Sequence, residues 1–158
     1  MTTRALSSKG STLVEVLVVA GVLASITLAI FGTLSLLARF HEKNMSAIKG
    51  QLLAEEGIEA IRFIKASGWS TLSAIPVNTA RYLTLSPSSW GVTTTPEIID
   101  GEFWRTIKVY SVSRDVSSDI VTSGGVVDSN TLLIESSVSW LWRGATSTAT
   151  YQSYITNL

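Results

Sequence analysis

The hydrophobic pattern of the chain begins with 23 consecutive residues, 16–38, that carry no charged side chain. About 20 apolar residues in a helix cross the hydrocarbon core of a bilayer, so this run predicts a membrane-spanning helix over residues 11–38. One carboxylate, Glu15, stands at the start of the run. Because a charge at the edge of lipid is costly unless it is paired, we expect Glu15 to have a partner or a use.

From residue 39 the pattern becomes that of an amphipathic helix. Apolar residues recur at spacings near 3.6 and charged residues fill the other positions, which predicts a second helical half over residues 39–67. The two halves together predict one helix from Ser11 to about Ala66. Its second half has an apolar stripe of Met45, Ile48, Leu52, Ile58, Ile61 and Ile64, widened by Leu53, Ala60 and Phe63.

Glycines occur within this helical pattern and at its end. Gly50 and Gly57 are candidate bends, and Gly68 is the expected end of the helix. Within the uncharged run, Gly21 and Gly32 are small residues that allow another helix to approach closely.

Beyond the helix the pattern becomes that of β-structure. Residues 68–96 are rich in Ser, Thr and Pro and predict a connecting loop with some β-structure. Alternating apolar positions and β-rich composition predict strands at Phe103–Arg114, Thr131–Trp142 and Thr148–Ile155. The expected fold class is therefore α+β, with the long helix packed on an antiparallel sheet of three to four strands.

Aromatic side chains mark a further feature of this region. Trp140 and Trp142 are two residues apart in a predicted strand, so they share one face of it. Either they pack in the core between sheet and helix, or they form a contact surface for a partner.

The composition narrows the function classes. The chain has no cysteine, which excludes a disulfide scaffold, thiolate metal sites and a cysteine nucleophile. Its 12 basic and 12 acidic residues give a formal net charge of zero. There is no basic stripe with interleaved aromatic residues, so no nucleic-acid partner is indicated.

No catalytic constellation is visible in the sequence. The single histidine, His41, lies among charged residues beside the apolar run, and the common nucleophile, phosphate-loop and zinc motifs are absent. Asp115, Asp119 and Asp128 could offer oxygens to calcium, but their spacing is not that of an EF-hand and favours solvated turn residues. We expect no enzyme activity, no metal site and no cofactor.

Residues 9–15 read Lys-Gly-Ser-Thr-Leu-Val-Glu and lead directly into the uncharged run. This segment resembles the class III signal of type IV pilins and of the pseudopilins of type II secretion. The resemblance implies that a prepilin peptidase cuts after Gly10 and removes residues 1–10 as a leader. Ser11 then becomes the N-terminal residue and is N-methylated, although this family often has Phe or Met there. Glu15 becomes the fifth mature residue, where the family keeps a glutamate.

The chemistry of such a cut gives Glu15 a partner. Cleavage creates an α-amino group at Ser11, four residues before the carboxylate of Glu15. In a bundle of helices the carboxylate of one subunit can meet the amine of its neighbour, and pairing removes the cost of a desolvated charge. Alternatively, Glu15 only reaches the membrane surface from the first turn of the helix, where a negative charge suits the helix dipole.

The resemblance, which covers about residues 9–38, implies a pilin-like architecture and a structural subunit of a type IV pilus, with a minor pilin favoured. The implied partners are the prepilin peptidase, other pilin subunits in a helical filament and an inner-membrane assembly platform. The precursor would cross the inner (cytoplasmic) membrane once, and the assembled subunit would lie in an extracellular filament at the cell surface. The expected parts are a leader (1–10), a filament-core helix (11–38), an amphipathic half (39–67) and a β-rich head (68–158).

Two other functions remain open at this point. Within the same family, the chain could be a pseudopilin of a type II secretion or DNA-uptake machine. From a different class, it could be an unprocessed surface-binding protein held by a single membrane-spanning helix.

Overall fold

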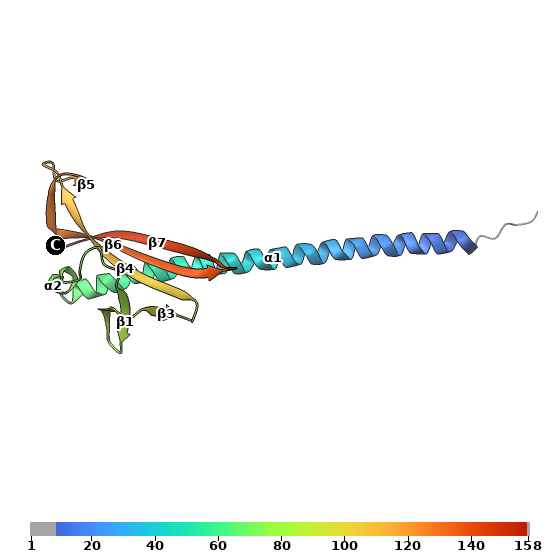
Figure 1. The fold of residues 1–158 in the computed structure, drawn as a ribbon, viewed down its shortest axis with the longest axis horizontal. Helices are drawn as coiled ribbons and strands as arrows, with labels where there is room; N and C mark the ends of the chain where they lie inside the picture. The colour runs from blue at the N-terminus through green and yellow to red at the C-terminus, as the bar shows by residue number, and fades with distance from the viewer. Residues whose placement is uncertain (1–8, 158) are drawn as a thin grey trace, which may run out of the picture. The chain divides into compact units, whose positions relative to one another are not determined.

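The computed structural model describes residues 9–157, and side chains over 12–96 and 98–157. The fold is α+β, as predicted: a long helix, α1 (Lys9–Ala66), is followed by antiparallel β-structure (Figure 1). The chain divides into two compact units, residues 1–43 and 44–158, so that α1 contributes to both. Each unit is described below by itself.

Helix α1 begins two residues before the predicted start and ends at the predicted Ala66. Its last turn carries Lys65, a charge that is favourable near the negative end of the helix dipole. The next turn closes with a hydrogen bond of 2.9 Å from the Gly68 N–H to the Lys65 carbonyl. Gly68 has a φ of 140°, which residues with a side chain rarely adopt, so glycine ends the helix as expected.

The main sheet of the second unit is antiparallel, with the strand order β3-β4-β6-β7. A short fifth strand, β5, pairs with β4 and lies off this path. This main sheet has one or two more strands than the sequence predicts, because β3 and β5 are too short to show a pattern. The strands are β3 (Glu97–Ile99), β4 (Phe103–Arg114), β5 (Ile120–Val121), β6 (Val126–Trp142) and β7 (Ala145–Thr156).

The three long strands confirm the three predicted ones, and β4 has the predicted bounds. The other two are longer than predicted, since β6 begins at Val126 and β7 at Ala145. They are joined by a two-residue turn whose central residues, Arg143 and Gly144, have φ angles of 49° and 82°. Two positive φ angles are typical of the type I′ turn, which matches the twist of a hairpin.

The segment predicted as a loop with some β-structure contains a short helix and a separate hairpin. Helix α2 (Trp69–Ser73) is followed by β1 (Tyr82–Ser86) and β2 (Ser89–Thr93), which pair with each other. Arg81 and Ile107 exchange backbone hydrogen bonds of 2.8 Å, which attach this hairpin to β4.

The core of the second unit lies between the final turns of α1 and one face of the sheet. Burial alternates along β4 and β6, so every second side chain points toward the helix. The largest cluster of buried residues contains Ile58, Ala60, Ile61, Ile64, Leu72, Ile75, Leu83, Ile107, Val109, Leu132, Ile134 and Ile155.

One charged side chain is buried at the same interface. Arg105 of β4 is 1% exposed. Its Nη1 donates to the Leu53 carbonyl and lies 3.2 Å from a carboxylate oxygen of Glu56, so it joins the sheet to the helix. Its guanidinium also lies over the ring of Trp90, 5.6 Å from the centroid. Because Arg105 has a carboxylate, a carbonyl and an aromatic ring around it, its charge is compensated.

Two glycines of α1 mark its closest approach to the sheet. A Cβ atom on Gly50 would lie 2.5 Å from a ring carbon of Trp140, and one on Gly57 would collide with the Ser136 hydroxyl. Ala54 lies between them and is also buried. Both glycines, interpreted from sequence as candidate bends, lie within the continuous helix. Their physical role here is to let the sheet approach the helix backbone.

The predicted apolar stripe is wrong in part, because glycine and alanine, not the large apolar residues, face the sheet along part of α1. Met45, Ile48 and Leu52 are 54%, 51% and 60% exposed, and Phe63 is exposed as well. Between Gly50 and Gly57 the helix faces the sheet with small residues. A sequence pattern based on large apolar residues does not identify such a face. The predicted positions Ile58, Ile61 and Ile64 are buried as expected.

We predict that Gly57→Ala destabilises the head, although alanine is the better helix former. Overpacking costs about 1–3 kcal/mol, which exceeds the roughly 1 kcal/mol gained in helix propensity. Denaturant titration of the variant and the wild type gives the difference in their free energies of unfolding, which is the net effect of overpacking and helix propensity. Adding Ser136→Gly should restore most of the loss, because it removes the colliding hydroxyl and Cβ. An increase in stability from Gly57→Ala alone would contradict the close contact.

Candidate functional site

The predicted cleavage bond lies in the first turn of α1, which begins at Lys9 and contains both Gly10 and Ser11. Residues 1–8 of the predicted leader lie outside the described part of the chain, as does the side chain of Ser11. Cleavage and methylation therefore stay predictions.

Glu15 is exposed on α1, one helical turn after Ser11. Its neighbours Val14 and Val16 are 60% and 64% exposed, so the carboxylate lies in an apolar setting. Within the part of the chain that the structure describes, Glu15 makes no hydrogen bond or ion pair. Its carboxylate is thus available to a group supplied from elsewhere.

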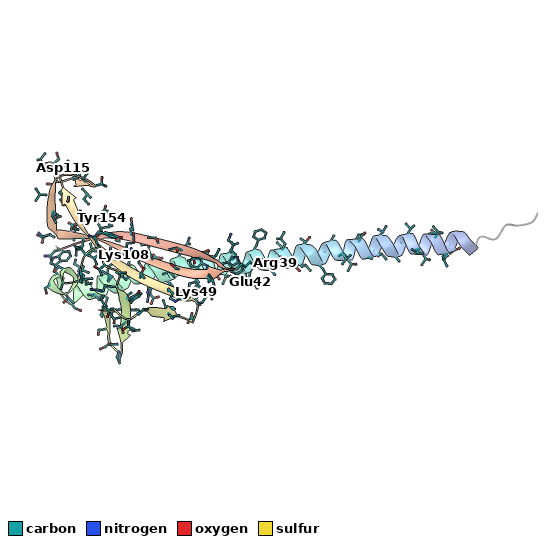
Figure 2. All side chains as sticks on the ribbon, in the orientation of Figure 1. Arg39, Glu42, Lys49, Lys108, Asp115 and Tyr154 are labelled. Carbon is teal, nitrogen blue, oxygen red and sulfur yellow. The ribbon has the colours of Figure 1, made fainter. Side chains whose placement is uncertain are left out.

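The helix surface around and after Glu15 is apolar on every side. Its large side chains are each at least half exposed, whereas a helix that is hydrophobic all round is normally buried in protein or lipid. The first charged side chains after this surface include Arg39 and Glu42 (Figure 2). The exposed apolar residues are Leu13, Val14, Val16, Leu17, Val18, Val19, Val22, Leu23, Ile26, Leu28, Ile30, Phe31, Leu34, Leu36 and Leu37.

Three hydroxyl groups within this surface are satisfied by the helix itself. Ser25 donates to the Val22 carbonyl at 2.8 Å, and Thr27 donates to the Leu23 carbonyl at 2.8 Å. Thr33 does the same with the carbonyl four residues before it, at 2.9 Å. A hydroxyl paired in this way does not need water, so these residues remain compatible with lipid or with a packed bundle.

The glycines of this half differ from those of the second half. A Cβ atom on Gly21 or Gly32 would meet nothing within 4 Å, whereas one on Gly50 or Gly57 would collide with a side chain of the sheet. Gly21 and Gly32 therefore leave open positions on the helix surface, and contacts within the described chain do not explain them.

Among the described residues, one helix is long and apolar enough to cross a membrane, and its apolar stretch lies near the N-terminus. The chain thus carries a candidate single membrane-spanning segment. Comparison of the chain with protein-family models, with curated proteins and with solved structures finds no match. The functional argument therefore depends on the residues and their arrangement.

The head places the three candidate calcium aspartates in different roles. An Asp115 carboxylate oxygen accepts the N–H groups of Ser117 and Asp119, at 2.9 and 3.0 Å, as in a tight polar turn. Asp128 instead pairs with Arg114 at 2.7 Å. Among the described side chains, His, Asp and Glu form no group of three or more that could hold a metal ion.

The tryptophan pair belongs to the core packing of the head, with Trp140 buried and Trp142 partly buried. Trp140 is buried, and its ring centroid lies 5.8 Å from that of Phe103. Trp142 packs against the same cluster from the same face of β6. Of the two interpretations from sequence, the structure supports core packing for this pair.

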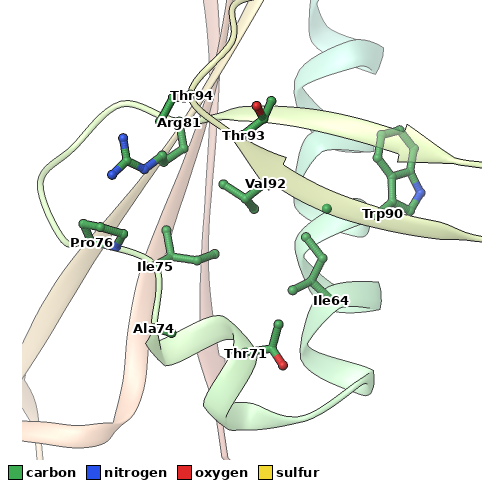
Figure 3. Close-up of a pocket in the computed structure, with 11 residues that line it drawn as sticks. Ile64, Thr71, Ala74, Ile75, Pro76, Arg81, Trp90, Val92, Thr93 and Thr94 are labelled. Carbon is green, nitrogen blue, oxygen red and sulfur yellow. The ribbon is translucent and has the colours of Figure 1, made fainter.

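One pocket of about 330 Å³ lies between the end of α1, α2 and the β1–β2 hairpin. Trp90 and Arg81 stand on opposite sides of it, with Val92 and Ile75 between them (Figure 3). The Arg81 guanidinium makes no hydrogen bond or ion pair with the described residues. The lining has no carboxylate, imidazole or thiol, so it can offer binding contacts but not a pair of groups for acid–base catalysis.

Asp128 has a markedly lowered pKa for which its hydrogen bonds account. The Arg114 side chain donates to its carboxylate at 2.7 Å, Thr131 donates at 2.6 Å, and the Asn130 N–H donates at 2.8 Å. These hydrogen bonds, with that of Arg114 the largest cause, lower the pKa of Asp128 from 3.8 to about 2.

We predict that Asp128 contributes stability at neutral pH that is lost in acid. Because its pKa is lower in the folded state, the contribution is present above the unfolded pKa of 3.8 and disappears as the pH falls through about 2. Asp128→Asn should lower the thermal midpoint at neutral pH and reduce the further loss on acidification. Asp119→Asn is the matched control and should follow the wild type. Identical pH profiles for Asp128→Asn and wild type would contradict this pairing.

Proposed function

We propose that the chain is a structural subunit of a type IV pilus, of the minor pilin kind, cut after Gly10 and assembled through the first half of α1. The observation that carries this proposal is the combination of Gly10, Ser11 and Glu15 with the exposed apolar surface that follows them. Each part alone fits other proteins, but the combination describes a helix prepared for removal from a membrane.

The apolar surface requires an apolar environment. Burying one Val, Leu or Ile side chain is worth about 1.5–3 kcal/mol, and this half of α1 exposes many of them. Lipid provides this environment for the precursor, and a bundle of pilin helices provides it for the assembled subunit. The open positions at Gly21 and Gly32 allow such helices to approach closely.

Glu15 gives this bundle a polar contact. After cleavage, the amine of Ser11 on one subunit pairs with the Glu15 carboxylate of a neighbour. Over the described residues Glu15 is exposed and unpaired, which supports this use. A desolvated carboxylate is costly without its amine, so the pair favours one axial register of the helices.

The mass of the membrane-extracted protein tests processing. We expect the mature species to lack residues 1–10 and to carry one added methyl group. Gly10→Val should remain at full length, because the peptidase would no longer find its cleavage residue. A wild-type species that still begins at Met1 would overturn the proposal and would favour the unprocessed membrane-anchored protein.

Substitution of Glu15 tests assembly separately from processing. We expect Glu15→Ala to be cleaved normally but to enter sheared filaments at least about tenfold less, because the neighbouring amine loses its partner. Quantitative mass spectrometry of the sheared fraction measures this ratio. Glu42→Ala, which removes a carboxylate beyond the apolar run, is the control and should assemble normally. Normal incorporation of Glu15→Ala would exclude the amine pairing.

The composition of sheared filaments also separates the pilus from a pseudopilus. A pilus subunit should be recovered in long surface filaments. Recovery only in the cell envelope, after normal cleavage, would favour the pseudopilin of a secretion or DNA-uptake machine.

A further inference from the structure

Strand β7 forms one edge of the main sheet. Over the described residues it pairs with β6 and with no other strand (Figure 1). Its pairing runs from Ala145 to Thr156 without a register shift, so the edge has no bulge. An edge strand presents a row of backbone N–H and C=O groups to which another strand can bind.

The sequence of β7 lacks the devices that usually protect an edge. Its twelve residues, Ala-Thr-Ser-Thr-Ala-Thr-Tyr-Gln-Ser-Tyr-Ile-Thr, include no charged residue, no proline and no glycine. They are rich in Thr and Tyr, which favour strands. The opposite edge is different, because β3 has three residues and directly follows Pro96. One edge of the sheet is thus short and interrupted, and the other is long and open.

The hydrogen-bonding pattern between β6 and β7 shows which backbone N–H and C=O groups of β7 point away from β6. The Asn157 N–H donates to the Asn130 carbonyl at 2.8 Å, in register with the β6–β7 ladder. Because hydrogen-bonded and non-hydrogen-bonded pairs alternate in an antiparallel ladder, odd-numbered residues of β7 bond to β6. The N–H and C=O groups of the even-numbered residues, including Thr148, Thr150 and Gln152, therefore point away from β6.

Side chains on the solvent face hold this edge in place. Thr150 and Thr148 form hydroxyl hydrogen bonds of 3.0 and 3.2 Å with Ser137 and Ser139 of β6. Gln152 donates to the Glu135 carboxylate at 2.8 Å. The side chains of Thr148, Thr150 and Gln152 are thus engaged with their own sheet. Of the outer backbone groups, the Tyr154 carbonyl accepts a hydrogen bond of 3.5 Å from the Ser153 hydroxyl.

We propose that the β7 edge pairs with β7 of a second copy of this chain, in antiparallel orientation, to form one continuous sheet. A second copy fits because the twelve residues of β7 carry no charge that would oppose itself across the contact. The nearby cation of Arg62, which donates to the Ser153 hydroxyl at 3.3 Å, is already paired with Glu59 at 2.6 Å. Such a contact is two-fold and closes on itself, so it joins two subunits and does not propagate. Because β7 runs alongside the second half of α1 in the same direction, the contact sets these halves of the two copies in opposite directions. It does not depend on cleavage or on the first half of α1.

Single cysteines test the contact, because the chain has none of its own. Thr148→Cys, Thr150→Cys and Gln152→Cys are each prepared in the full chain in detergent and treated with a short bis-maleimide. Opposed residues of paired strands lie about 5 Å apart, so the yield of covalent dimer should peak at one of these positions. Ser117→Cys, in an exposed turn, is the control and should give little dimer. Equal yields at Ser117 and along β7 would overturn the proposal, because association through α1 does not discriminate between them.

A second test removes a backbone hydrogen-bond donor of β7. It is made in whichever cysteine variant, Thr148→Cys or Gln152→Cys, gives the higher yield of cross-linked dimer. Thr150→Pro removes an N–H that points away from β6, so the β6 ladder remains intact. Thr150→Ala loses the same hydroxyl but keeps the N–H. Because the two-fold contact loses the donor in both copies, Thr150→Pro should reduce dimer yield at least about tenfold relative to Thr150→Ala.

A charge provides the same test without a change in the backbone. Ser147→Lys places like charges on both copies and should also reduce the yield, while circular dichroism reports whether each variant folds. Unchanged yield in both the proline and the lysine variants would overturn the proposal. Failure of cleavage or of filament assembly would leave this result unaffected.

Discussion

The close contact between α1 and the sheet is the constraint on which the rest of the head depends. Gly50 and Gly57 leave no side chain between the helix backbone and β6, so Trp140 and Ser136 can lie against it. This approach brings the buried guanidinium of Arg105 within reach of the Leu53 carbonyl and Glu56. It also decides which helix residues face outward, since large side chains such as Leu52 no longer have space on the sheet side.

The same helix serves two different environments along its length. Beyond residue 44 its inward face is covered by a sheet, and glycine there permits close packing. Before that point its apolar side chains are exposed and its glycines contact nothing within 4 Å. The hydroxyls of Ser25, Thr27 and Thr33 are paired with the helix backbone, which removes their need for water. The first half is therefore suited to lipid or to neighbouring helices, as the proposed pilin function requires.

The sheet has polar contacts of its own that limit what it can bind. Glu135 accepts hydrogen bonds from Tyr110 and Gln152, and the pKa of Tyr110 is raised by burial and by that carboxylate. Side-chain chemistry on this face is thus largely used within the sheet. The backbone edge of β7 is what remains for another strand, which is why we place a further contact there and not on the sheet's face.

The sequence by itself determined the helix, the three long strands and the α+β class, because charge-free runs and residue periodicity act locally. It also supplied Gly10, Ser11 and Glu15, whose significance lies in their order along the chain. Only the tertiary structure decided that Gly50 and Gly57 are contact points, that Met45, Ile48 and Leu52 face outward, and that β7 is an edge. These properties depend on which segments meet in space, and small residues leave no periodic hydrophobic signal to reveal it.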